Sequence, residues 1–159
     1  MIRDAIFSKC KTYRYELHRI WDAEGPKIMF LMLNPSTANE TIDDRTVSRC
    51  INYAQEWGYG GLLIGNLFSY RSRYPEKLFC PDDPIGPLNN FHLKEMSKRC
   101  ERVICAWGNS SLIKKLNFDI SKLNDIKAPL FYLEKMKDGT PKHPLYLRKS
   151  LLPRPFSIK

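Results

Sequence analysis

The feature that most constrains the fold is an almost wholly apolar run at residues 27–33, KIMFLML. A strand that is covered on both faces shows a continuous apolar run, and such strands lie at the centre of α/β sheets. The run ends at Asn34 and Pro35, and a second strand-like run at residues 61–68 contains Asn66 close to its end. Two strands that finish in a carboxamide indicate a binding site at their ends.

The segment before this run has the pattern of a half-buried strand. Residues 13–21 alternate apolar side chains with Arg14, Glu16 and His18, which predicts one apolar face and one polar face. A turn-like stretch, DAEGP, follows. We therefore expect an antiparallel hairpin at the N-terminus.

An amphipathic helix is expected after Asp43 and Asp44. The apolar residues between positions 46 and 57 have the spacing of one helical stripe, one of the two aspartates is the expected N-cap, and Gly58 is the expected end. The other expected elements are the strand at 61–68, a helix from Pro87 to about Cys100, a strand at 102–107, a short helix near 110–117 and a last strand at 128–133.

This order predicts an α/β fold, a three-layer sandwich with a mostly parallel central sheet, helices on both faces and the N-terminal hairpin. The 159 residues, 43% of them hydrophobic, predict a single domain with residues 151–159 as a peripheral tail. The segment from Ser69 to Pro87 contains four prolines and predicts a long irregular loop, a length that points to a function.

Composition limits the classes of function. No apolar run is long enough for a membrane span and the N-terminal MIRDAIFSKCK lacks a signal-peptide core, so a cytoplasmic protein without a membrane partner is expected. The five cysteines form no CxxC pair, which argues against a disulfide framework or a metal site, and no cofactor is expected. The net charge of +9 favours DNA or a nucleotide as partner, although many basic proteins bind no polyanion. The sequence leaves the oligomeric state open.

Polar segments follow four of the expected strands, at residues 34–36, 66–71, 108–110 and 137–143. In open α/β sheets ligands bind beyond the carboxyl ends of the strands, so we expect these segments to line one edge. Two interpretations stay open for Asn66, whose amide either contacts a ligand or bonds to neighbouring backbone. Two interpretations also stay open for His143, which is either a hydrogen-bond donor near neutral pH or a solvated loop histidine.

Read in order, four segments resemble the uracil-DNA glycosylase superfamily. Residues 61–71, GLLIGNLFSYR, are similar to the strand whose asparagine recognises the uracil edge, and residues 102–109, RVICAWGN, to its V-x-x-x-W-G segment. Residues 143–147, HPLYL, resemble its H-P-S-P-L loop, and residues 33–36, LNPS, the first motif of the branch with Asn-Pro in place of Asp-Pro.

A second resemblance covers most of residues 13–147. With its N-P-S-T-A and D-D-x-T segments, the chain resembles a family of small bacterial and phage proteins that is defined as a domain of unknown function. This resemblance implies no activity.

The glycosylase resemblance implies roles for individual residues. Asn34 would position the attacking water, Asn66 would recognise a nucleobase edge, and His143 would bond a base carbonyl and stabilise negative charge on the departing base. Leu147 falls at the position of the superfamily's duplex wedge, which supports base flipping. Access to duplex DNA would require such flipping.

The departures from the superfamily matter for the chemistry. The amide of Asn34 cannot act as a general base, and Asp43 and Asp44 are the candidate substitutes, their other interpretation being helix caps. Tyr70 and Phe68 are the candidates for stacking on a base, although both positions also suit core residues. The remaining candidates for contacts to phosphate or nucleic acid are Ser36, Arg71, Asn109, Ser110, Lys142, Leu147 and Arg148.

Three functions stay open at this point. The first is a nucleobase-handling enzyme that hydrolyses the N-glycosidic bond of a damaged or modified base. The second is a non-catalytic protein that binds nucleic acid or a modified nucleotide on the same fold. The third is an enzyme that acts on a small phosphorylated metabolite at the ends of the strands.

Overall fold

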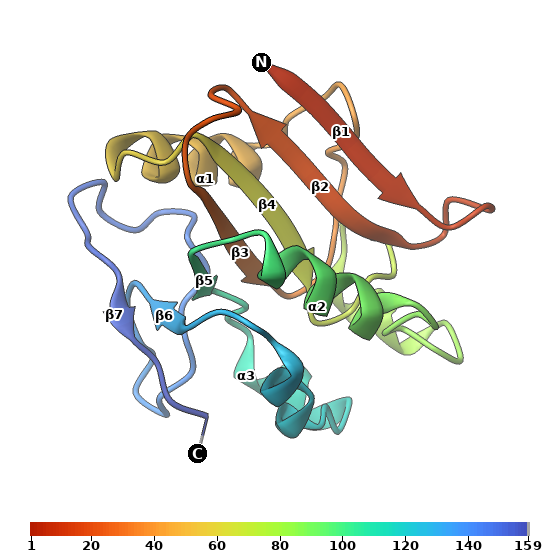
Figure 1. Cartoon of the computed structure of the whole chain (residues 1–159). Helices are drawn as coiled ribbons and strands as arrows, with labels where there is room; N and C mark the ends of the chain where they lie inside the picture. Colours follow the sequence, from red (N-terminus) through yellow and green to blue (C-terminus); the bar gives the residue numbers. More distant parts are fainter. Residues whose placement is uncertain (159) are drawn as a thin grey trace.

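A computed structural model describes residues 1–158, which form a seven-stranded mixed sheet (Figure 1). The strands are β1 (Ile2–Phe7), β2 (Arg14–Ile20), β3 (Lys27–Met32), β4 (Gly61–Asn66), β5 (Arg102–Cys105), β6 (Leu130–Tyr132) and β7 (Arg154–Pro155). Their order in the sheet is β1-β2-β4-β3-β5-β6-β7. The four central strands are parallel and the outer ones pair antiparallel, which confirms the predicted α/β fold with a mostly parallel centre.

An N-terminal antiparallel hairpin is present, but it is formed by β1 and β2 and not, as expected, by the two strands on either side of DAEGP. β1 was not predicted, because an exposed edge strand carries little apolar pattern. β2 does not pair with β3, the next strand in the chain, but with β4, which lies between them. The C-terminal tail adds β7, a two-residue strand at the opposite edge.

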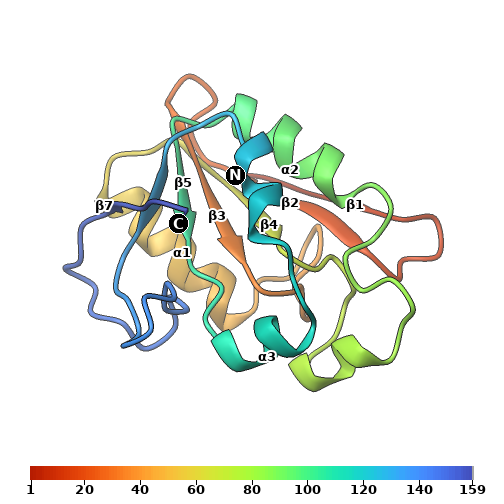
Figure 2. The ribbon, with the colours of Figure 1, turned by 90° about the horizontal axis from the view of Figure 1, so that it is seen from below.

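Helices cover both faces of the sheet, as predicted (Figure 2). They are α1 (Arg45–Glu56), α2 (Asn89–Lys98), α3 (Ser110–Lys115) and two short 3₁₀ helices, η1 (Pro75–Phe79) and η2 (Ile120–Asp125). Phe30 of β3 packs in the core under α1, whereas Met29 and Leu31 pack in the core under α2. After Lys27, β3 is wholly apolar because both of its faces are buried, each large apolar side chain contributing about 1.5–3 kcal/mol.

The start of α1 follows the sequence prediction and decides between the two aspartates. Oδ1 of Asp44 accepts a hydrogen bond from the Val47 amide at 2.9 Å, so Asp44 is the N-cap. Asp43 instead forms ion pairs with Arg3 and Arg19, at 2.8 and 2.7 Å. The helix ends at Glu56, before Gly58 with its φ of +84°.

The prediction that β2 carries a solvent-facing polar side is wrong for its charged residues. Glu16 is buried under α2, where its carboxylate accepts from Arg99 and bonds the rings of His18 and His92. Arg14 is also buried, but it contacts Asn66 of β4 and not this cluster. Packing of α2 on the strand, which no local pattern reveals, removes the polar face from water.

A β-bulge between Arg14 and Glu16 places their side chains on opposite faces of the sheet. Phe7 pairs with Arg14 and Ile6 pairs with Glu16, so Tyr15 is an extra residue in β2. Such a bulge changes the side of the sheet on which the preceding residue lies. Tyr15 stacks on His92 of α2, and Arg14 is turned towards the face that carries the start of α1.

The connections of β3 and β5 place a crevice between these two strands. β3 continues into α1 on one face, whereas β5 continues into α3 and η2, whose Leu112 and Leu123 pack in the core of the other face. Neighbouring strands whose connections leave to opposite faces open a crevice at their carboxyl ends. Within residues 1–158, no helix has the length and apolar character of a membrane span.

Candidate functional site

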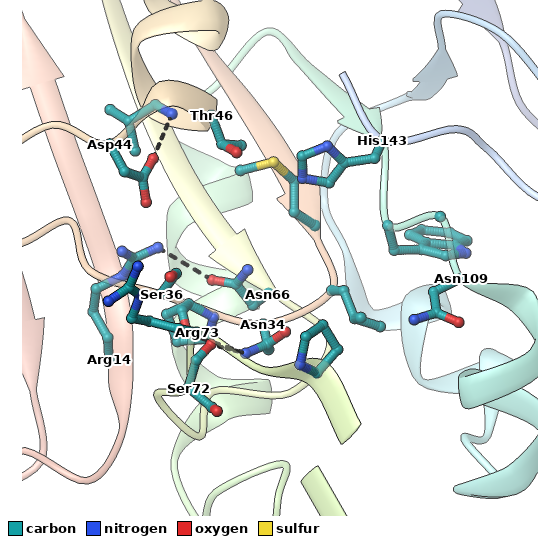
Figure 3. A pocket seen from close by; sticks show the side chains of 17 residues that line it. Arg14, Asn34, Ser36, Asp44, Thr46, Asn66, Ser72, Arg73, Asn109 and His143 are labelled. Atoms are coloured by element: carbon teal, nitrogen blue, oxygen red, sulfur yellow. Dashed lines mark hydrogen bonds between the residues drawn. The ribbon is translucent and has the colours of Figure 1, made fainter. Parts of the chain in front are cut away.

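A cavity of about 350 Å³ lies at the carboxyl ends of the central strands (Figure 3). Its walls come from the ends of β3, β4 and β5, the start of α1 and the segment after β6. The cavity brings together Asn34, Asn66, His143 and Asp44, which the sequence analysis selected as site residues. Ser36 and Asn109 also line it.

Asn66 is the last residue of β4 and only 2% exposed. Its Oδ1 accepts from Nη2 of Arg14 at 3.5 Å. Since a guanidinium has only donors, this contact sets the amide oxygen towards Arg14 and leaves the NH2 group on the other side. That NH2 group has no hydrogen-bond partner within the described chain, so it offers two donors to a ligand. Bonding of the amide to neighbouring backbone, the alternative interpretation, is not observed.

Asn34 presents the opposite end of its amide. Its Nδ2 donates to the backbone carbonyls of Pro35, at 3.1 Å, and Ser72, at 2.9 Å. These two bonds use both N–H groups and hold the side chain in place, so Oδ1 is the atom left for a ligand. Asn34 is therefore suited to accept a hydrogen bond from water or from an N–H group of a ligand.

His143 is held as a neutral hydrogen-bond donor. Its Nδ1 accepts from the Leu145 amide at 3.2 Å, which places the ring hydrogen of the neutral form on Nε2. Burial lowers the pKa of His143 below its usual value, and the carboxylate of Asp44 opposes this only in part. The imidazole is consequently neutral at neutral pH, with Nε2–H free to donate to a carbonyl oxygen.

Gly108 allows the His143 segment to pack closely on the end of β5. Its φ is +59°, and a Cβ at this position would lie 3.3 Å from the backbone nitrogen of His143. The Gly108 amide also donates to the carbonyl of Pro141 at 2.9 Å. The positive φ and the close approach favour glycine at the contact that places His143 in the cavity.

Asp44 has two roles in this geometry. One carboxylate oxygen caps α1, and the side chain also lines the cavity. The helix-cap interpretation is therefore confirmed, and the position of Asp44 in the cavity wall keeps it a candidate for the missing general base. Asp43, the other candidate, is bound by Arg3 and Arg19 and does not line the cavity.

Four charged or polar residues of the cavity were missed: Arg14, Thr46, Ser72 and Arg73. Arg14 had been placed on a polar strand face, and the bulge at Tyr15 that turns it has no signature in the sequence. Ser72 and Arg73 lie in the irregular loop after β4. Only its proline content and unusual length pointed to a function.

Several predicted contact residues lie outside the cavity. Phe68 is 1% exposed and packs against Phe118 in the core under α2, so its burial does not agree with stacking on a base. The alternation of side chains between the two faces of the sheet ends with β4, and Leu67 and Phe68 both pack in the core under α2. Leu147 packs against the core under α1 and not outward, whereas its neighbour Tyr146 is 78% exposed with a φ of +72°.

The other phosphate candidates are also distributed away from the cavity. Ser110 lies in a separate hollow with Asp138, and Lys142 pairs with Glu134 at 3.3 Å. Arg148 is exposed, and its backbone carbonyl accepts from the hydroxyl of Tyr53. None of the three lines the cavity.

A basic groove adjoins the cavity. Its lining residues are Lys11, Thr12, Ser36, Thr37, Tyr70, Arg71, Ser72 and Arg73. Ser36, Ser72 and Arg73 line both hollows, so the groove continues from the cavity wall. All of its charged lining residues are basic, and it contains the predicted Tyr70 and Arg71.

Fold and site together define a doubly wound α/β protein with a polar cavity at the point where the direction of its connections changes. Residues 14–145 match a family model described as "Protein of unknown function (DUF1643)", and the chain belongs to this family. The matched region begins at Arg14 and includes Asn34, Asp44, Asn66 and His143. No curated protein and no solved structure matches the chain.

Proposed function

We propose that the protein handles nucleobases and hydrolyses the N-glycosidic bond of a damaged or modified base. The observation that carries this proposal is the arrangement of Asn66, His143, Asn34 and Asp44 around one cavity. Its volume of about 350 Å³ falls in the range of sites for small ligands. The four glycosylase-like segments support the proposal because each contributes a residue to this cavity.

Recognition of the base rests on donors that are already oriented. The NH2 group of Asn66 and the Nε2–H of His143 would bond to carbonyl oxygens at the edge of a planar ring. When the C–N bond breaks, its electron pair stays on the base, which becomes negative. Fixed donors in a site shielded from water stabilise that charge more than they stabilise the uncharged base.

Asn34 and Asp44 would act on the sugar side of the bond. Oδ1 of Asn34 would accept from the attacking water, since its Nδ2 is occupied by backbone carbonyls. The Asp44 carboxylate would stabilise the positive charge that builds on the sugar and accept a proton from the water as the new C–O bond forms. The departing base then takes up a proton from solvent.

The basic groove suits the phosphates of a nucleic acid strand. Lys11, Arg71 and Arg73 would neutralise phosphates, and the hydroxyls of Ser36 and Thr37 would donate to phosphate oxygens. Tyr70 would lie along this path and not inside the cavity. A strand that follows the groove would deliver its nucleotide to the cavity through the shared wall of Ser36, Ser72 and Arg73.

Release of free base tests the proposal. Oligonucleotides containing uracil, hypoxanthine or mismatched thymine are incubated with excess protein, and released base is quantified by mass spectrometry. We expect release by the wild type, at least about a hundredfold less with His143→Ala or Asp44→Asn, and no change with Lys94→Met on the exposed side of α2. No release by the wild type above buffer would rule out hydrolysis of these bases.

A second candidate function is binding without catalysis. It is favoured by the carboxylate of Asp44, one oxygen of which is already occupied as the cap of α1, and by the amide at position 34. Binding of an oligonucleotide that weakens steeply with salt, with no product formed, would support this alternative.

A further inference from the structure

Arg14 is a buried cation with an incomplete set of partners. It is 3% exposed and lines the cavity, and Figure 3 shows its side chain reaching towards Asn66. Nη1 donates to the carbonyl of Ala38 at 3.1 Å, and Nη2 makes the long contact of 3.5 Å to Asn66. Nε is buried without a partner, and among residues 1–158 no ion pair involves Arg14.

Arg19, on the same strand, shows how this chain satisfies a buried arginine. It is 0% exposed, and its Nε donates to the carboxylate of Asp43 at 2.7 Å. Both terminal nitrogens donate to backbone carbonyls, those of Asp4, His18, Asn39 and Ile42. The difference between the two arginines is that, among the described residues, no carboxylate forms an ion pair with Arg14, the one that faces a cavity, although the charge of Asp44 acts on it.

A buried guanidinium without an anion is costly for the folded protein, since both its charge and its N–H groups lose water. Burial lowers the pKa of Arg14 to about 10, the charge of Asp44 opposes this shift, and Arg71 and Arg19 add to it. Arg14 nevertheless stays charged at neutral pH. Arg73, Ser36 and Ser72 lie on the same side of the cavity, which adds further donors there (Figure 3).

We infer that the ligand of this cavity carries a negatively charged oxygen group, a carboxylate or a phosphate, which binds to Arg14 beside the NH2 group of Asn66. The inference rests on the proposed function, because it names the chemical class of the ligand in the same cavity. Asp44 lies at the start of α1, so the anionic part of the ligand faces Arg14 and its uncharged part faces the carboxylate. An anionic group bound at Arg14 would pair with its guanidinium as the carboxylate of Asp43 pairs with Arg19.

Matched neutral and anionic probes test this inference by calorimetry at constant ionic strength. Uracil is compared with orotate, which adds a ring carboxylate, and uridine with uridine monophosphate, which adds a phosphate. Inorganic phosphate is the fifth probe. We expect the wild type to bind at least one anionic probe about tenfold or more tightly than its neutral partner, the pair identifying carboxylate or phosphate as the group. Equal affinities in both pairs, or no binding of any anionic probe, would overturn the inference.

Arg14→Met separates a ligand contact from a structural role. The neutral side chain removes an unpaired buried charge, so the thermal midpoint should stay or rise while the preference for the anionic probe disappears. Lys94→Met, which removes an exposed charge on α2, should keep the preference. A preference that survives Arg14→Met overturns the inference. If this variant does not fold, Arg14→Gln, which can still donate to Ala38, is measured in the same way.

The outcomes also separate this inference from the proposed function. Binding of inorganic phosphate by the wild type but not by Arg14→Met, with no binding of uracil or uridine, would support the anion site and count against a nucleobase site. Tight binding of uracil or uridine, with no higher affinity for orotate or uridine monophosphate, would support the nucleobase site and count against the anion site.

Discussion

Nη2 of Arg14 lies 3.5 Å from Oδ1 of Asn66, although 52 positions separate the two residues in the sequence. The contact orients an amide that would otherwise be free to turn over, and so decides that donors rather than an acceptor face the cavity. It also links the predicted base-contacting residue to the buried cation. Each of the two side chains therefore influences what the other can bind.

Asn66→Asp should weaken ligand binding without loss of stability. The new carboxylate would pair with Arg14 and offer no donor to the ligand, so affinity should fall at least about tenfold while the thermal midpoint stays or rises. Calorimetry and thermal unfolding measure both quantities. Asn90→Asp, on the exposed surface of α2, is the control and should change neither. Unchanged ligand affinity in the Asn66 variant would show that the amide does not contact the ligand.

Binding should depend on pH through His143. Because its pKa is lowered in the folded protein, the neutral ring persists below the usual value of 6.5. Protonation of Nδ1 would end the bond from the Leu145 amide that holds the ring, so affinity should fall only below the folded pKa. Unfolded chains protonate first, so the stability that this group contributes is present above 6.5 and is lost as the pH falls towards the folded pKa. NMR titration of the imidazole gives the folded pKa directly. A folded pKa above 6.5 would contradict the neutral assignment.

Gly108→Ala tests the packing of the His143 segment. The positive φ and the 3.3 Å approach to the His143 nitrogen predict a loss of about 1–2 kcal/mol in the free energy of unfolding, together with weaker ligand binding. Gly139→Ala is the matched control, since its φ is +88° but no atom lies within 4 Å of the added Cβ. The control should lose stability and keep ligand binding. Equal effects of the two substitutions on ligand binding would show that the contact of Gly108 with His143 does not position the site.

Glu16 should make the fold sensitive to acid. Burial alone would raise the pKa of its carboxyl, but hydrogen bonds from His18, His92 and Arg99 outweigh this and lower it to about 2. A depressed pKa contributes stability above the unfolded value of 4.5, and that stability is lost as the pH falls towards 2. Glu16→Gln should cost about 2 kcal/mol at pH 7 and less at pH 3, as urea unfolding can measure. Glu24→Gln, at an exposed position, should cost nothing at either pH.

The basic groove should determine the salt dependence of oligonucleotide binding. If Lys11 and Arg73 each contact one phosphate, replacing either by Gln lowers the slope of log K against log salt by about 0.7–0.9. Fluorescence anisotropy across a salt series gives the slope. Lys122→Gln, outside the groove, should leave it unchanged. A slope that none of these substitutions alters would place the nucleic acid on another surface.

The central part of the fold and much of the site could be predicted because both depend on local pattern. Continuous apolar runs located β3 and β4, and the polar residues at their ends had to meet at one edge of a parallel sheet. Asn34 and Asn66 were therefore found from the sequence, and the helix cap was narrowed to Asp43 or Asp44. Edge strands such as β1 and β7 have little apolar pattern and were not predicted.

The rest depends on contacts between distant segments. The bulge at Tyr15 arises from the pairing of β2 with β1, and it alone turns Arg14 to the cavity. The burial of Phe68 depends on how the chain leaves β4, and that of Leu147 on its contact with the core under α1. No window of sequence contains this information.

The extra residue in β2 links the proposed charge of the ligand to the length of a strand. A relative that lacks one residue at this point would direct the side chain at position 14 towards α2 and leave its cavity without a cation, even with every other residue the same. If Arg14 binds the anionic group of the ligand, a single gap at this point of an alignment would distinguish relatives that take acidic ligands from those that take uncharged ones.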